Sequence, residues 1–181
     1  MRAPREQIPG ATYHVTSRGN RRQPIYQDEK DRARFLAILR CVVRERSWSF
    51  HYYCLMTNHY HLLFTTPAGD LAAGMHALNG GYARTFNRRH GHSGHLFEKR
   101  YYSILVTRES HFVGLFRYLA LNPVRAGLCE NPLDWRWSSY AAAAGLTRCP
   151  DFVSLDAVHG AFSDNVHAAQ RFLRKFVETL N

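Results

Sequence analysis

The chain has 181 residues, which suits one domain of ordinary size with a buried core. A hydrophobic fraction of 45% with 13% aromatic residues argues against a disordered chain. The formal net charge is +10, and all of the Lys and Arg residues except Lys30, Lys99 and Lys175 are Arg. Because the planar guanidinium grips phosphate and stacks on bases, this bias favours a nucleic-acid partner, with the codon usage of a GC-rich genome as the alternative.

The cysteines and the N-terminus bear on location. None of the four cysteines forms a CxxC pair, so a zinc ribbon is not expected. The first ten residues lack the apolar stretch of a signal peptide, and no run approaches the ~18 apolar residues of a membrane span. We therefore expect a cytoplasmic protein with free thiols and no membrane partner.

The first half of the chain predicts a strand, a helix and a hairpin. Residues 12–17 alternate and are rich in β-branched and aromatic types, which predicts a strand. Asp28 stands at the N-cap position of a helix that we expect to run to about residue 45. Two strand-like runs, 47–56 and 59–66, follow on either side of a short turn and predict the hairpin.

The second half predicts two more helices and one more strand before a change of pattern. Residues 71–86 place apolar side chains on one helical stripe, although two adjacent glycines, at roughly 1 kcal/mol each, allow a break. Residues 96–107 predict a fourth strand, and residues 108–122 predict a helix that ends at Pro123.

This order of elements is the ferredoxin-like β-α-β-β-α-β order with an added helix, in the α+β class. We expect a mainly antiparallel four-stranded sheet with its helices on one face and the other face available. Residues 1–128 would form the main domain. Residues 129–181, with an amphipathic helix at 165–180, would form a helical extension packed on the same domain.

Two histidines stand one residue apart in the strand "HYHLLF". Side chains at i and i+2 of a strand point to the same face, so His59 and His61 lie side by side, with Cα atoms roughly 6.5–7 Å apart. They could converge on one metal ion, or they could be two surface histidines. Alone they make an incomplete site, because metals take four to six ligands.

A tyrosine and an asparagine share one face of the helix predicted at 108–122. Tyr118 and Asn122 are four residues apart, so a nucleophilic hydroxyl and a hard amide ligand project from the same side. The alternative is a half-buried tyrosine and an asparagine that caps the helix before Pro123.

The motifs "GATYHVTSRGNRRQPIY", "HYHLLF", "YLALNPVRAGL" and "WRWSSY" together resemble the single-tyrosine HUH transposases, above all the REP-associated tyrosine transposase branch. The resemblance covers roughly residues 9–140. It implies a ferredoxin-like fold, a metal-binding pair at His59 and His61, a nucleophile at Tyr118 and a completing ligand at Asn122. It also implies Mg²⁺ or Mn²⁺ as cofactor and single-stranded or hairpin DNA as partner. The family usually has an aliphatic residue where this chain has Tyr60.

The resemblance therefore implies a metal-dependent single-stranded DNA endonuclease and strand transferase. It would cut through a 5′-phosphotyrosine intermediate, beside hairpins such as REP elements, as a monomer or a homodimer. Two readings compete with it. One is a non-catalytic nucleic-acid-binding protein with the same sheet, and the other is a histidine–metal hydrolase of small phosphoesters.

Basic residues after the first strand, beside the fourth strand and after the helix at 108–122 are candidates for contacts with DNA phosphates, and Tyr101 and Tyr102 could stack on bases. Solvated loops are the alternative for each of them. His14 is expected to be structural, and the histidines between residues 90 and 95 do not suggest a metal cluster. The candidate DNA-binding residues are Arg18, Arg21, Arg22, Arg88, Arg89, Lys99, Arg100 and Arg125.

Overall fold

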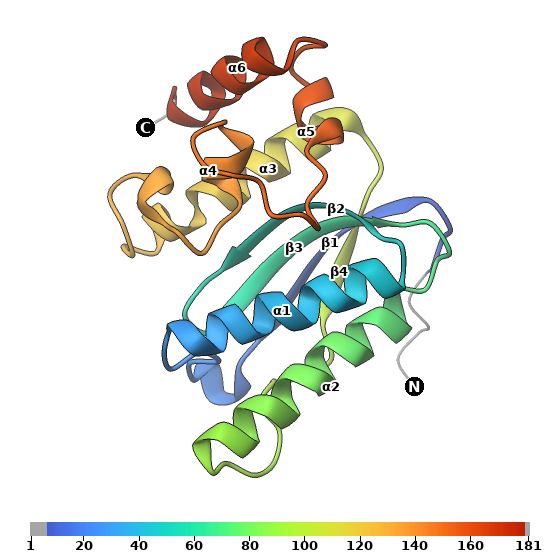
Figure 1. Cartoon of the computed structure of the whole chain (residues 1–181), viewed down its shortest axis with the longest axis vertical. Coiled ribbons are helices and arrows are strands. Elements are labelled where there is room, and N and C mark those ends of the chain that lie inside the picture. Colours follow the sequence, from blue (N-terminus) through green and yellow to red (C-terminus); the bar gives the residue numbers. More distant parts are fainter. Residues whose placement is uncertain (1–6, 180–181) are drawn as a thin grey trace.

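A computed structural model describes residues 7–179. Its strands form one sheet in the order β2-β3-β1-β4, and each neighbouring pair is antiparallel. This is the predicted ferredoxin-like strand arrangement. Helices lie on both sides of the sheet, not on one side as predicted (Figure 1). The elements are β1 (Ala11–Arg18), η1 (Asn20–Arg22), α1 (Glu29–Glu45), β2 (Ser49–Leu55), β3 (His59–Thr66), α2 (Leu71–His90), β4 (Tyr102–Val106), α3 (Glu109–Arg125), η2 (Pro132–Asp134), α4 (Tyr140–Ala143), α5 (Asp156–Gly160) and α6 (Val166–Glu178).

The larger core lies between one face of the sheet and the helices α1 and α2. α1 begins at the predicted cap, where the Asp28 side chain accepts a hydrogen bond from the backbone N–H of Asp31. Alternate residues of β3 supply this core from the sheet, because they point to the same face. The core side chains from β3 are Tyr60, Leu62 and Phe64.

A second core covers part of the opposite face, which corrects the prediction that one face would stay free. Tyr52 and Cys54 of β2 and Leu63 of β3 project from this face and are apolar or aromatic, so exposing them to water would be unfavourable. α3 and the C-terminal helices pack over these side chains. The β1–β4 half of the same face is more open, as the 58% exposure of Tyr102 shows.

Three predicted elements differ in the structure. α2 runs unbroken through its two glycines, and the fourth strand spans only Tyr102–Val106, because residues 96–101 form a loop. α3 continues past Pro123 to Arg125. A proline so close to the C-terminus removes one N–H donor, while Ala126 N still donates to the carbonyl of Asn122 at 3.0 Å.

The C-terminal extension is joined to the outer edge of β2 by main-chain hydrogen bonds. The N–H of Leu55 donates to the carbonyl of Trp137 at 2.8 Å, and the N–H of Ser139 donates to the carbonyl of Tyr53 at 3.0 Å. The segment "WRWSSY" thus forms an isolated antiparallel bridge, between Cys54 and Ser138, that covers the end of this edge. The predicted last helix is present as α6, capped by Asn165 and ending at Glu178; the expected last position, residue 180, lies outside the described residues.

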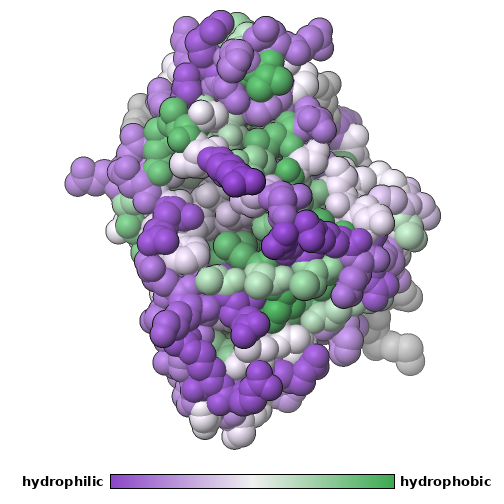
Figure 2. Space-filling view, in the orientation of Figure 1, coloured by the Kyte–Doolittle hydropathy of each residue, from purple (hydrophilic) through white to green (hydrophobic). Residues whose placement is uncertain are grey.

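Hydrophilic residues dominate the lower part of the view, over α2, while a band of hydrophobic residues crosses its middle, near α1 (Figure 2). Within residues 7–179, no helix combines the length and apolar character that crossing a membrane requires.

Candidate active site

The two histidines lie at the beginning of β3, in the centre of the sheet. His59 pairs with Arg18 of β1 and His61 pairs with Thr16, and the two imidazole rings are 5.0 Å apart between centroids. Tyr60, between them, points into the opposite core and is fully buried. Its departure from the family's usual aliphatic residue therefore leaves the histidine pair undisturbed.

One ring nitrogen of each histidine is held by a neighbour. His59 Nδ1 lies 2.8 Å from Asn58 Oδ1, and because an amide oxygen only accepts, His59 Nδ1 donates. His61 Nδ1 lies 3.0 Å from His14 Nε2, and the two rings are stacked at 5.2 Å between centroids. These bonds leave Nε2 of both His59 and His61 for another ligand. This is the usual way in which a second hydrogen bond fixes the tautomer of a metal-binding histidine.

Burial keeps these imidazoles neutral. It lowers the pKa of His59 to about 4, and the positive charge of Arg18 acts in the same direction. Burial likewise lowers the pKa of His14 to about 4 and holds the pKa of His61 well below 6.5. At neutral pH both members of the pair therefore have one ring nitrogen with a free lone pair, as coordination requires.

α3 brings the predicted nucleophile to the histidines. The Tyr118 ring stands edge-on to the His61 ring, with 6.5 Å between centroids, and 45% of Tyr118 is exposed. The Arg125 guanidinium carbon lies 5.3 Å from the centroid of the same ring. The phenol ring thus lies close to both an imidazole and a cation.

Asn122, one turn after Tyr118, has a buried side-chain nitrogen without a hydrogen-bond partner among the described residues. A buried amide group without a partner is unfavourable unless a ligand satisfies it. Rotation of the amide about its last bond presents its oxygen, an acceptor that can bind a metal, at the same position. The sequence alternative, Asn122 as a helix cap, is wrong, because the helix continues and its cap is Ala126.

Two imidazoles and an amide oxygen form a mixed donor set that suits Mn²⁺ and Mg²⁺, with water or phosphate oxygens completing the shell. No group of three or more His, Cys, Asp or Glu side chains that could hold a metal occurs in the part of the chain that the structure describes. His59 and His61, with the unpartnered amide of Asn122, are the residues that would hold the implied ion.

Sequence reasoning missed the supporting roles of two residues. His14 was expected to be structural, but its contact with His61 makes it a support of the site. Asn58 lies in the predicted turn of the hairpin, and its Oδ1 accepts a hydrogen bond from His59 Nδ1. Its Nδ2 donates a second hydrogen bond to the carbonyl of Arg22 at 2.8 Å. The alternation of side chains along β1 puts His14 on the same face as Thr16, which pairs with His61. This alternation was the only signal in the sequence for a role of His14 near the site.

Arg18, Lys99 and Arg100 gather in one groove beside the site. The β4 groove, as we call it, has a volume of about 260 Å³. Exposed Tyr102 lies in it, two strands away from His61 in the sheet register. Tyr101, the other tyrosine expected to stack, is mostly buried in the larger core. The groove is lined by Thr16, Ser17, Arg18, Glu98, Lys99, Arg100, Tyr101 and Tyr102.

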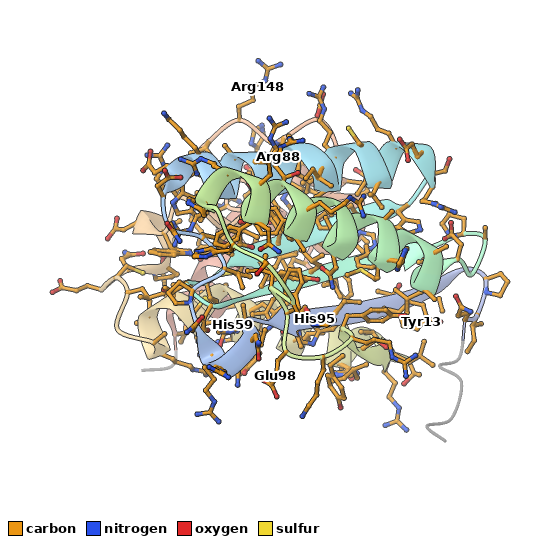
Figure 3. All side chains as sticks on the ribbon, turned by 90° about the horizontal axis from the view of Figure 1, so that it is seen from below. Tyr13, His59, Arg88, His95, Glu98 and Arg148 are labelled. Carbon is orange, nitrogen blue, oxygen red and sulfur yellow. The ribbon has the colours of Figure 1, made fainter. Side chains whose placement is uncertain are left out.

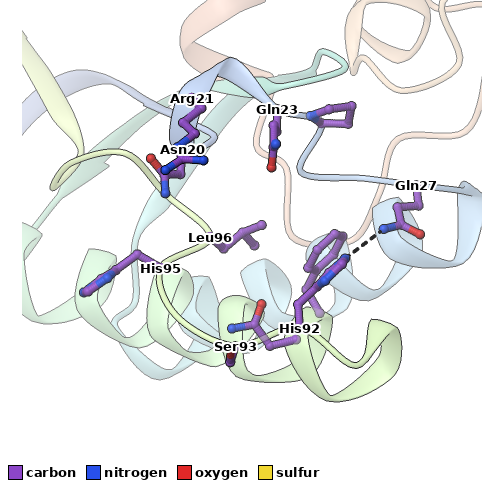
Figure 4. A pocket seen from close by; sticks show the side chains of 11 residues that line it. Asn20, Arg21, Gln23, Gln27, His92, Ser93, His95 and Leu96 are labelled. Carbon is purple, nitrogen blue, oxygen red and sulfur yellow. Dashed lines mark hydrogen bonds between the residues drawn. The ribbon is translucent and has the colours of Figure 1, made fainter.

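Arg21 lines a separate cavity of about 420 Å³ between the loop after β1 and the loop after α2 (Figure 4). Gln27 and His92 face each other across its rim, with 3.3 Å between their side-chain nitrogens. Arg21 and Arg22 both have left-handed backbone conformations, with φ of 52° and 61°, which is unfavourable for side chains other than glycine. The loop is held there by Asn58, next to His59.

Arg88 and Arg89 lie elsewhere. Figure 3 shows Arg88 on the outer side of α1 and α2, with these helices between it and His59. Arg89 donates to Asp28 at 2.7 Å and also bonds Asp31, so its guanidinium joins α2 to α1. As the side chains stand, neither arginine contributes to the histidine site, and their predicted phosphate contacts stay predictions.

The model of the family described as "Transposase IS200 like" matches residues 7–120, more than half of the chain. The chain belongs to this transposase family. The match includes the histidine pair and Tyr118, and it confirms the family expected from the four motifs. Among curated protein sequences, none matches the transposase significantly.

Solved structures agree with the fold. A structure described as a REP-associated tyrosine transposase bound to a REP hairpin has a TM-score of 0.67 at 20% identity, covering 87% of this chain and 96% of the other. The tRNA(His) guanylyltransferase of Saccharomyces cerevisiae has a TM-score of 0.51 at 8% identity, covering 98% of this chain and 82% of the other. At these identities the likeness shows a shared fold.

Proposed function

We propose that this transposase cuts and rejoins single-stranded DNA through a covalent bond to Tyr118. The observation that carries the proposal is the edge-on contact of Tyr118 with His61, at 6.5 Å between ring centroids, beside two imidazoles that are neutral at pH 7. A binding protein without chemistry has no use for this arrangement, and that supports catalysis over the non-catalytic alternative.

Cleavage follows from these positions. The Tyr118 oxygen attacks the scissile phosphorus, the phenol proton passes to solvent, and the bond from phosphorus to the 3′ oxygen breaks. The departing oxygen takes up a proton and becomes a free 3′-hydroxyl, while the 5′-phosphate stays on the tyrosine. Attack by a second 3′-hydroxyl reverses these steps and joins a new strand, so the energy of the broken ester is kept.

A bound Mg²⁺ or Mn²⁺ ion, held by His59, His61 and Asn122, would draw charge from the scissile phosphate and orient the in-line attack. The side chains of the protein contribute orientation of the reacting groups and positive charge. Asn58 and His14 fix the two imidazoles, and Arg125 places a positive charge near the phenol, where negative charge develops during attack.

The substrate is single-stranded DNA next to a hairpin. The open half of the sheet offers arginines, a lysine and an exposed tyrosine, which suit a flexible strand with accessible bases. The structurally similar REP-associated transposase is bound to a REP hairpin, which supports the same class of substrate here. The contact between Tyr118 and His61 within one chain supports a site that is assembled in a monomer, and a homodimer is the alternative.

The test uses labelled single strands and hairpins taken from DNA beside the gene, incubated with the transposase and Mn²⁺. We expect a covalent adduct on a denaturing gel, its loss in EDTA and in Tyr118→Phe, and near-normal DNA binding by that variant. Tyr140→Phe is the control, since its buried hydroxyl has no hydrogen-bond partner among the described residues and lies outside the site. An adduct that survives in Tyr118→Phe would overturn the proposal.

A further inference from the structure

A cavity of about 480 Å³ lies between α2 and residues 94–101. It is on the face of the sheet that α1 and α2 cover, and the histidines lie on the other face. We propose that this α2 cavity binds one unpaired base of the DNA strand that the active site cuts. The inference rests on the proposed function and deepens it by naming a site for substrate recognition. The residues lining the cavity are Ala72, Met75, His76, Asn79, Gly80, Ala83 and 94–101.

The size and lining suit a planar ring. Met75 and Ala83 of α2 face Leu96 and Phe97 across the space, so the walls are mostly apolar, as in small-molecule sites generally. A flipped base is recognised by stacking on such walls together with a few hydrogen bonds to its edge. The cavity offers both kinds of contact.

Gly80 leaves the space open. A Cβ added at Gly80 would approach Arg84 Nη1, the tip of a flexible side chain, at 3.3 Å, so the helix itself tolerates a larger residue there. Gly81 faces the other way, toward Ile38 of α1, where an added Cβ would make an ordinary contact at 3.5 Å. Glycine is unfavourable inside a helix, and α2 runs unbroken through this pair. Access to the cavity accounts for the glycine at position 80.

Asn79 supplies an oriented polar group at the cavity. Its Oδ1 accepts a hydrogen bond from Tyr60 at 2.6 Å, which places the amide nitrogen on the other side, 3.5 Å from Ser17 Oγ. The amide has two N–H donors, so at least one stays available for the cavity. An oriented donor selects a base edge that presents an acceptor, such as a ring nitrogen or a carbonyl oxygen.

The α2 cavity and the β4 groove share the segment from Glu98 to Tyr101, with Lys99 and Arg100 between them. Arg18, at the far side of the groove, pairs with His59. A strand leaving the active site can therefore cross the open half of the sheet beside Tyr102 and turn around the 98–101 segment. The two cations are placed to contact its phosphates, and the next base can enter the cavity.

The test measures binding of a fluorescein-labelled single-stranded oligonucleotide of mixed sequence by anisotropy. Gly80→Leu and Ala83→Leu should each weaken binding about tenfold or more by filling the cavity, while Gly81→Ala should bind like the unchanged chain. Circular dichroism and thermal unfolding establish that the variants are folded. Unchanged affinity in both filling variants would overturn the proposal.

Two further measurements locate the base. Removing single bases from the oligonucleotide in turn should reveal one position whose loss weakens binding as much as Gly80→Leu does, and the two changes should not add. A 5-iodouracil at that position should cross-link under light to α2 or to residues 94–101. Cross-links confined to β4 would contradict the cavity. None of these readouts uses Tyr118, so the cavity and the covalent chemistry can fail independently.

Discussion

His14 Nε2 and His61 Nδ1 are 3.0 Å apart, and this contact joins β1 to the histidine pair of β3. For His61 to coordinate through Nε2, its Nδ1 must carry the ring proton. Nδ1 then donates a hydrogen bond to His14 Nε2, which accepts it. His14 is thus a positioning residue that selects the tautomer of a ligand, without touching the substrate.

Replacing His14 by Phe keeps an aromatic ring but removes the acceptor. We expect Mn²⁺ affinity to fall by roughly 10- to 100-fold, the usual effect of losing such a support, and His14→Gln to recover part of it through its amide oxygen. Titration calorimetry or the Mn²⁺ electron-spin signal measures this without DNA. Equal affinity in all three chains would mean that the contact has no role in metal binding.

The stability of the metal-free protein should fall as the pH is lowered from 7.5 to 5. Burial lowers the pKa of His14 to about 4 in the folded chain, whereas an unfolded histidine titrates near its ordinary value of 6.5. Between these two values the unfolded chain binds more protons, so acid favours unfolding; above 6.5 the two states bind equally and the stability is fully present. Thermal unfolding in a chelator measures the slope, which should be shallower in His14→Phe. A slope identical in both chains would contradict the low pKa of His14.

Arg89 and Arg88 form a matched pair for testing what the ion pairs between α1 and α2 contribute to stability. Arg89 bonds Asp28 and the buried Asp31, and it holds the pKa of Asp28 well below its usual range. Arg89→Ala should lower the midpoint of thermal unfolding because it leaves the Asp31 carboxylate with fewer partners. Arg88→Ala should leave that midpoint unchanged. The reverse order would mean that the ion pairs between α1 and α2 do not hold the helices together.

Arg125 should matter for the rate of cleavage more than for binding. Its charge lies beside the Tyr118 ring, so Arg125→Ala should slow adduct formation by about 100-fold, as the loss of one electrostatic contact at a reacting oxygen commonly does. Arg125→Lys should retain part of the rate. Single-turnover cleavage at saturating DNA isolates the chemical step, and a normal rate in Arg125→Ala would remove this residue from the site.

The order of elements along the sequence predicted the ferredoxin-like fold, and strand and helix periodicity predicted which side chains share a face. The roles of the site residues on β3 and α3 came from the family resemblance, and they stay predictions. The sequence could not predict that Arg89 would be engaged by Asp28 and Asp31, since nothing local records a contact between two separate helices. It also missed that Pro123 lies inside α3, because a proline in the last turn disrupts little of the helix. The sequence also did not predict that α3 and the C-terminal helices pack over Leu63. The face of the sheet on which a helix packs depends on contacts with distant parts of the chain.

The hydrogen bonds between β2 and the "WRWSSY" segment have a consequence for assembly. With the outer edge of β2 occupied, the sheet in the described part of the chain can extend into a second copy only along β4. That edge carries Tyr102 and adjoins the groove proposed for the DNA strand. Two copies joined through their sheets would therefore compete with the substrate for the same strand, so self-association by this route and DNA binding exclude each other.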